Sequence, residues 1–172
     1  VGRSDVYKRQ PLLRRRLRDI PGSKTIMVPL AWGCLGTVFP LILNYTSLLP
    51  RSLLVFFYIT SIAFIRTMTL DLLDLQGDQM VGRATLPIIL GERLAIKVLY
   101  LTTIGIIIMT FLCVLLNIFP KLGLAYGIVL IFLFYYLLKI GRRDITPGII
   151  SEATMDGQLV FMGIISLLGR VI

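Results

Sequence analysis

The chain has 172 residues, of which 56% are hydrophobic and 16% are charged, and its mean hydropathy is +0.87. Because soluble domains carry about 25% charged residues, this composition excludes an ordinary soluble domain and indicates an integral membrane protein. The net charge is +9, but the basic residues gather in alternate loops rather than on a basic helix with interleaved aromatics, so nucleic acid is not an expected partner. The chain has no histidine, which excludes imidazole metal ligands and histidine-activated nucleophiles.

The N-terminal region divides into two parts before the first apolar stretch. Residues 1–10 (VGRSDVYKRQ) are polar and unpatterned, and we interpret them as a non-native leader. Residues 11–25 form a basic connection that ends in a Pro21-Gly22 turn. Its arginines either set the topology of the protein or rest on anionic lipid headgroups. We interpret residues 11–172 as part of a single domain.

Five apolar stretches follow that are long enough to cross a bilayer, which takes about 17 to 25 residues. They lie at 26–48, 53–70, 94–117 and 122–140, and from about 158 to the end, where the last stretch is short. The sequence therefore predicts an all-α, multi-pass transmembrane bundle of about five helices. A short turn between the first two stretches predicts an antiparallel hairpin, and Ala31, Gly33 and Gly36 allow close helix packing.

Lysines and arginines concentrate on one side of the predicted bundle. They cluster before the first stretch, after the second and after the fourth, whereas the opposite side has only Arg51, Lys121 and Arg170. By the positive-inside rule the basic side is cytoplasmic. We therefore expect a multi-pass protein of the cell membrane, or of the inner membrane in a bacterium, with its N terminus inside.

Asp71, Asp74 and Asp78 stand where the second apolar stretch ends, and they are three of the nine acidic residues. At helical spacing their directions fall within an arc of roughly 60°, so we expect them to share one face. Carboxylates at a membrane boundary are costly unless a cation compensates them, and Mg²⁺ takes oxygen ligands together with waters or phosphates. We therefore predict a cytoplasmic Mg²⁺ site that handles phosphate or diphosphate groups. A solvated acidic helix end is the alternative.

Two arginines are candidates for binding the same anion. Arg83 follows Asp78 beyond Gly82, and we expect it to fold back because guanidinium matches phosphate oxygens. Arg66 lies inside the second stretch, about 12 Å along the axis from Asp74, where a centred arginine costs about 3 kcal/mol. We expect Arg66 to line a polar cavity that opens at the aspartates, or else to extend to the headgroups.

The segment after the aspartates carries helix-breaking and helix-starting residues. Gly77 and Gly82 are expected to turn the backbone. Thr85 and Pro87 are expected to restart a helix, with threonine as its N-cap and proline in its first turn.

The full string D-x-x-D-x-x-G-D-x-x-x-G-R-x-T-L-P at residues 71–87 resembles the second aspartate-rich motif of the UbiA family of intramembrane prenyltransferases. The run Ile20-Pro21-Gly22-Ser23-Lys24, followed by Ala31-Trp32-Gly33, is similar to the start of the fifth helix in that family. Leu90-Gly91 and Asp156-Gly157-Gln158 are weaker similarities. Together these motifs cover about residues 14 to 172.

The resemblance implies a nine-helix bundle in which two aspartate-rich motifs on the cytoplasmic side hold a prenyl diphosphate through Mg²⁺. Family members transfer the prenyl group to a lipophilic or aromatic acceptor, commonly a quinone precursor. The resemblance makes Asp71, Asp74 and Asp78 metal ligands and assigns no further catalytic residue. It makes Arg83 a diphosphate contact, with Arg66 and Lys24 as further anion contacts.

The sequence departs from the family pattern in two ways. The first aspartate-rich motif does not occur in it, and five apolar stretches stand in place of nine helices. We therefore interpret residues 11–172 as the C-terminal part of a prenyltransferase domain and expect the chain alone to be inactive.

Two other functional classes put acidic residues in membrane proteins. The CDP-alcohol phosphotransferases have a pattern that opens with D-G-x-x-A-R, and this sequence has no such string. A non-enzymatic transporter or assembly subunit with a cytoplasmic cation site is the remaining alternative. It predicts acidic residues near mid-span and interrupted helices, whereas the three aspartates cluster at one boundary.

Overall fold

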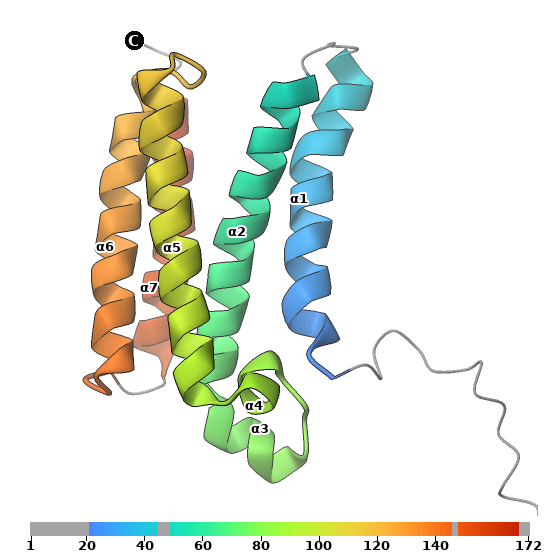
Figure 1. Ribbon diagram of the computed structural model, residues 1–172, viewed down its shortest axis with the longest axis vertical. Coiled ribbons are helices and arrows are strands. Elements are labelled where there is room, and N and C mark those ends of the chain that lie inside the picture. The colour runs from blue at the N-terminus through green and yellow to red at the C-terminus, as the bar shows by residue number, and fades with distance from the viewer. Residues whose placement is uncertain (1–20, 45–48, 146–147, 169–172) are drawn as a thin grey trace, which may run out of the picture.

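The computed structural model describes residues 21–44, 49–145 and 148–168. These residues form seven helices and no strands. The helices are α1 (Ser23–Asn44), α2 (Leu49–Leu73), α3 (Leu75–Val81), α4 (Leu86–Leu90), α5 (Glu92–Leu115), α6 (Gly123–Gly141) and α7 (Ile149–Leu168). In Figure 1 the five long helices run roughly parallel to one axis, and the short α3 and α4 lie at one end. The predicted all-α, multi-pass bundle is confirmed, whereas the proposed leader at residues 1–10 and the arginines between residues 14 and 18 lie outside the described residues.

Four helices are long and apolar enough to cross a membrane: Ser23–Leu43, Arg51–Leu73, Glu92–Leu115 and Gly123–Gly141. Their length and composition indicate an integral membrane protein. The described part of the fifth predicted stretch, up to Leu168, lies in α7. Helix α7 carries Glu152 and Asp156 and is not among the four candidate spans of the described residues.

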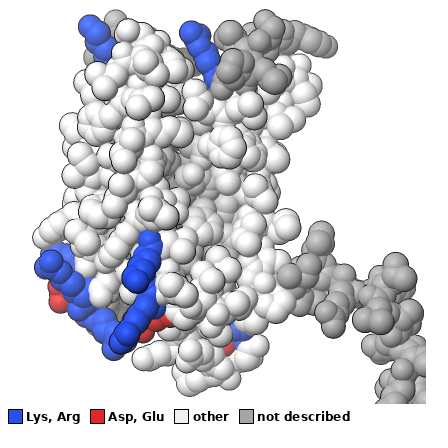
Figure 2. All heavy atoms as spheres, viewed as in Figure 1, with Lys and Arg blue, Asp and Glu red and all other residues white. Residues whose placement is uncertain are grey.

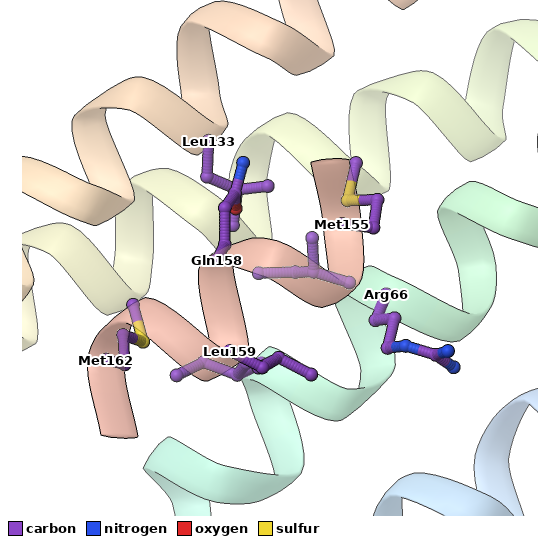
Figure 3. A pocket seen from close by; sticks show the side chains of 8 residues that line it. Arg66, Leu133, Met155, Gln158, Leu159 and Met162 are labelled. Carbon is purple, nitrogen blue, oxygen red and sulfur yellow. The ribbon is translucent and has the colours of Figure 1, made fainter. Parts of the chain in front are cut away.

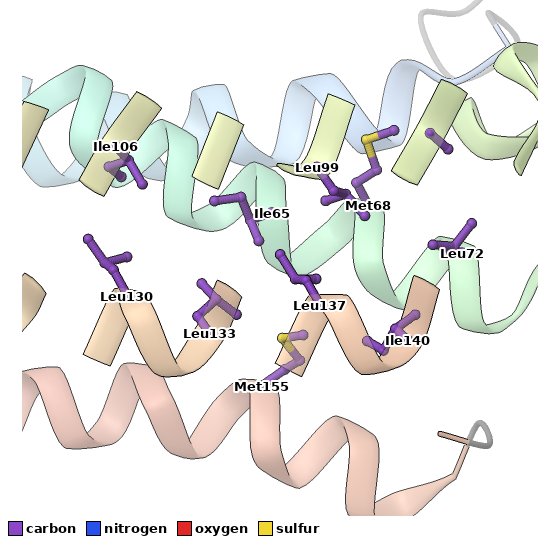
Figure 4. Close-up of a cluster of buried hydrophobic side chains, with 11 residues drawn as sticks. Ile65, Met68, Leu72, Leu99, Ile106, Leu130, Leu133, Leu137, Ile140 and Met155 are labelled. Carbon is purple, nitrogen blue, oxygen red and sulfur yellow. The ribbon is translucent and has the colours of Figure 1, made fainter. Parts of the chain in front are cut away.

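The hydrophobic core forms where α2 packs against α5 and α6, with one contribution from α7 (Figure 4). Helix α2 supplies Ile65, Met68 and Leu72, which are 1%, 0% and 8% exposed. The other core side chains are Ala95, Leu99, Ile106, Leu130, Leu133, Leu137, Ile140 and Met155. Helix α2 therefore anchors the bundle through the same turns that lead to the aspartates.

Helix α1 packs against the opposite side of α2 through small residues. A Cβ atom at Gly33 would collide with the Thr60 hydroxyl and the Phe56 ring, and one at Gly36 would collide with Ile59. The predicted close packing at both glycines is thus confirmed, while Ala31 is exposed. The outer face of α1 presents many large apolar side chains, which suits a lipid or protein environment in the membrane.

Helices α3 and α4 connect α2 to α5 in a compact turn (Figure 1). Gly82 ends α3 in the left-handed conformation, with φ of 71°, and its N–H bonds to the Asp78 and Gln79 carbonyls. The predicted restart of a helix is confirmed, with Thr85 at the N-cap position of α4 and Pro87 in its first turn. The Thr85 hydroxyl, however, makes no capping hydrogen bond. The predicted turn at Gly77 is wrong, because the helical hydrogen bonding of α3 continues through it.

Charged side chains concentrate at the end of the bundle that holds α3 and α4, while the walls are almost entirely uncharged (Figure 2). One contact at this end is the ion pair between Arg143 and Glu92, whose Nη2 and Oε2 atoms lie 2.9 Å apart. Apolar walls with charge at the ends fit a bundle embedded in a bilayer.

The close α1–α2 packing can be tested with Gly33→Leu. The added side chain must force the helices apart, and overpacking of this kind costs about 1–3 kcal/mol. We expect a lower melting temperature in detergent, measured by circular dichroism. The matched control is Gly105→Leu, where the structure has no atom within 4 Å of an added Cβ; an equal loss in both variants would contradict the packing described for Gly33.

Candidate functional site

The three aspartates follow one another through the junction of α2 and α3. Asp71 lies in the last turn of α2 and Asp78 in α3, and they are 7% and 9% exposed. Asp74 stands between the helices and is exposed. Its N–H bonds to the Leu70 carbonyl at 3.0 Å and its carbonyl accepts from the Asp78 N–H at 2.9 Å. This continuous hydrogen bonding keeps Asp71 and Asp78, seven residues apart, on the inner face.

Helix α1 brings two side chains to Asp71 from far away in the sequence. The Thr25 hydroxyl donates a hydrogen bond of 2.6 Å to Oδ2 of Asp71. Lys24, the preceding residue, acts on Asp71 with a favourable charge, whereas Asp78 and Asp74 act on it with unfavourable ones. The first turn of α1 therefore lies beside the aspartate segment.

The contact between Thr25 and Asp71 was not predicted from the sequence. A threonine at the start of an apolar helix is usually interpreted as a cap or a packing residue. Only the pairing of α1 with α2 shows that its hydroxyl meets Asp71.

Arg83 folds back onto α3 beyond the left-handed Gly82. Its N–H bonds to the Asp78 carbonyl at 2.9 Å, and its Nη1 lies 3.7 Å from Oδ1 of Asp78. The Arg83 side chain is 71% exposed, so this ion pair is weak. The guanidinium consequently remains accessible to an anion at the aspartates.

Arg66 points to α7 instead of to the aspartates. Its Nε donates to Oδ1 of Asp156 at 2.5 Å, which joins α2 to α7. Arg66 also lines a small cavity between α2, α6 and α7, shown in Figure 3. The other lining residues are Ile62, Ile65, Leu133, Met155, Gln158, Leu159 and Met162.

The predicted polar cavity at Arg66 therefore differs from the cavity in the structure. Its walls are apolar apart from Arg66 and Gln158, and none of the three aspartates lines it. The physical reason is the position of Asp156, a carboxylate on α7 that draws the guanidinium to that helix. Gln158 is 8% exposed, and its Nε2 has no hydrogen-bond partner among the described residues.

The donor chemistry of the aspartate segment fits a magnesium ion that is shared with a phosphate. Across the described residues, no three or more His, Cys, Asp or Glu side chains lie close enough together to hold a metal ion by themselves. Mg²⁺, however, is usually bound by one or two carboxylates, with waters and substrate phosphates completing its coordination. Two buried carboxylates and an exposed one supply oxygen ligands of this kind, so the residues present fit an open site rather than a closed cage.

Comparison with known proteins decides the family. A model of the UbiA prenyltransferase family matches residues 12–148, which include the aspartate segment, Lys24, Thr25 and Arg66. The chain belongs to the UbiA prenyltransferase family. Membership identifies this UbiA chain as a membrane prenyltransferase in general, with a prenyl diphosphate and a lipophilic acceptor as the implied partners. No curated protein and no solved structure matches it.

The ion pair between Arg66 and Asp156 should make the stability of the fold depend on pH. The guanidinium of Arg66 holds the pKa of the Asp156 carboxyl below its usual value, which is about 3.9. Because the pKa of Asp156 is lower in the folded state, the ion pair stabilises the fold at pH values above the usual pKa. This stabilisation is lost as the pH falls through the lowered folded-state pKa. We expect the melting temperature to drop between pH 7 and pH 3 by a larger amount in the wild type than in Arg66→Gln.

The difference between the two proteins will be small, since both side chains are partly exposed and such pairs contribute about 0.2–1 kcal/mol. Asp156→Asn is the matched second variant and should behave as Arg66→Gln does. An identical pH dependence in all three proteins would contradict the ion pair.

Proposed function

We propose that the aspartate segment and the first turn of α1 form a Mg²⁺-dependent diphosphate site. At this site the protein transfers a prenyl group from an isoprenoid diphosphate to a lipophilic acceptor, a quinone-type precursor, within the membrane. The observation that carries the proposal is the burial of Asp71 and Asp78 at the end of a membrane-spanning helix, with Lys24 and Arg83 beside them. Family membership supplies the reaction class.

The charges of the site favour a divalent cation. Asp71, Asp74 and Asp78 bring three negative charges, and Lys24 and Arg83 bring two positive ones, which leaves a net negative charge. Such a site would repel a diphosphate unless a divalent cation were bound beside the aspartates. We therefore assign the three aspartates to Mg²⁺, and Lys24 and Arg83 to the diphosphate oxygens.

Arg66 is proposed as a further diphosphate contact. Its Nε is occupied by Asp156, which leaves its two Nη groups for an anion. Its position on α2, before the aspartates, would place that contact deeper in the membrane than the contacts of Lys24 and Arg83.

The proposed chemistry begins with loss of diphosphate from an allylic carbon. A magnesium ion held by the aspartates would supply Lewis-acid stabilisation of the leaving diphosphate. The basic side chains stabilise the same developing charge. The apolar helices give the isoprenoid tail a slot and keep water away from the allylic cation until the acceptor attacks it. The concentration of basic residues at this end supports a cytoplasmic location for the site.

The second half of the site is proposed to come from an N-terminal part of the domain. Family substrates are expected to be held between two aspartate-rich motifs, and residues 71–87 supply the second of them. We therefore propose that residues 11–172 act together with a part that carries the first motif.

The proposal predicts that Asp74→Ala abolishes turnover without disturbing the fold, because Asp74 is exposed. The assay uses membranes that contain the chain joined to the expected N-terminal half, and it measures Mg²⁺-dependent release of diphosphate from geranyl, farnesyl and geranylgeranyl diphosphates with a panel of acceptors. We expect release to fall by about 100-fold or more, the size of the loss when one preorganised electrostatic group is removed.

The matched control is Asp144→Ala, which removes an exposed carboxylate from the loop after α6. It should leave release unchanged. Folded protein whose release of diphosphate is absent, or is indifferent to Asp74→Ala, would overturn the proposal and favour a transporter or assembly role.

A further inference from the structure

Thr25 makes a contact that packing alone does not require. Its side chain is completely buried, and its hydroxyl donates a hydrogen bond of 2.6 Å to Oδ2 of Asp71, a residue 46 positions away in the chain. The contact joins the first turn of α1 to the last turn of α2. It thereby links a neutral hydroxyl to the most buried carboxylate of the aspartate segment.

The other buried threonines of the described helices behave differently. Thr37, Thr69, Thr103 and Thr110 each donate to the carbonyl four residues earlier in their own helix, at 2.6 to 2.7 Å. This is the usual way in which a threonine satisfies its hydroxyl inside a membrane helix. Thr25 instead donates to the carboxylate of a residue on another helix.

The backbone around Thr25 is held in place from a second direction. The Gly22 N–H donates to the Ala84 carbonyl at 2.7 Å, and Gly22 has a φ of +72°. Leu86 and Ile89 of α4 lie beside Gly22. The first turn of α1 is therefore fixed against the segment that follows the aspartates, so the Thr25 hydroxyl has a defined position when it meets Asp71.

We propose that Thr25 is a positioning residue for Asp71, with its hydroxyl fixing the carboxylate in the orientation that binds the divalent cation. This inference rests on the proposed function, which makes Asp71 a metal ligand. The hydroxyl occupies Oδ2 and leaves Oδ1 for the cation. Groups that hydrogen-bond to metal ligands commonly change metal affinity by about 10- to 100-fold when they are removed, so Thr25 should contribute to binding without touching the metal or the substrate.

The test measures binding of Mn²⁺ to the purified chain joined to the expected N-terminal half, in detergent, by the electron paramagnetic resonance signal of free Mn²⁺. Thr25→Val keeps the shape of the side chain and removes the hydroxyl, and it should weaken Mn²⁺ binding by about tenfold or more. Thr25→Ser restores a hydroxyl at the same position and should bind within about threefold of the wild type. A merely structural role of Thr25 would not predict recovery of metal affinity by serine.

Thr103→Val is the matched control, because Thr103 is equally buried but donates only to the Leu99 carbonyl of its own helix. It should leave Mn²⁺ affinity unchanged. If Thr25→Val does not keep the circular dichroism spectrum of the wild type, Thr25→Ala is measured in its place, with the same weakening expected.

The outcomes separate this inference from the proposed function. Wild-type protein that binds no Mn²⁺, or whose binding survives Asp71→Asn, overturns both. Binding that is lost in Asp71→Asn but unchanged in the folded Thr25 variants overturns the positioning role of Thr25 and leaves the proposed metal site standing.

Discussion

The proposed site depends on the burial of Asp71 at the end of a membrane-spanning helix. Transfer of a carboxylate out of water costs several kcal/mol, and a hydrogen bond to a charged group returns about 1.5–3 kcal/mol. The hydrogen bond from Thr25 therefore offsets only part of the cost, and Asp78 and Asp74 add repulsion. A nearby Lys24 helps, and a divalent cation would complete the compensation.

The architecture brings the groups together because α2 is the central helix. One of its sides packs against the glycines of α1, and the other enters the core with α5 and α6. The packing of α1 on α2 delivers Lys24 and Thr25 to the aspartates, while the turn through α3 and α4 returns Arg83. The site is thus assembled at one end of the bundle by contacts that the apolar packing sets.

The sequence was sufficient to predict the helical class, the membrane location and the restart of a helix at Thr85, because hydropathy and capping act over short stretches. It also located the aspartate segment and its family. The contact of Thr25 and the helical conformation at Gly77 could not be predicted in this way. The contact of Thr25 depends on how α1 packs against α2, and Gly77 is helical because the hydrogen bonds of α3 continue through it. The direction of Arg66 likewise depends on Asp156, which is 90 residues away.

The most direct measurement is a crystal structure of the protein with Mn²⁺ and a non-hydrolysable farnesyl diphosphate analogue, using the anomalous signal of manganese to locate the ion. If the aspartates hold the ion, an anomalous peak should lie beside Asp71, Asp74 and Asp78. Diphosphate density should lie between that peak and the Lys24 and Arg83 side chains. A bound diphosphate at another place, or one held beside the aspartates without any metal peak, would contradict the central claim.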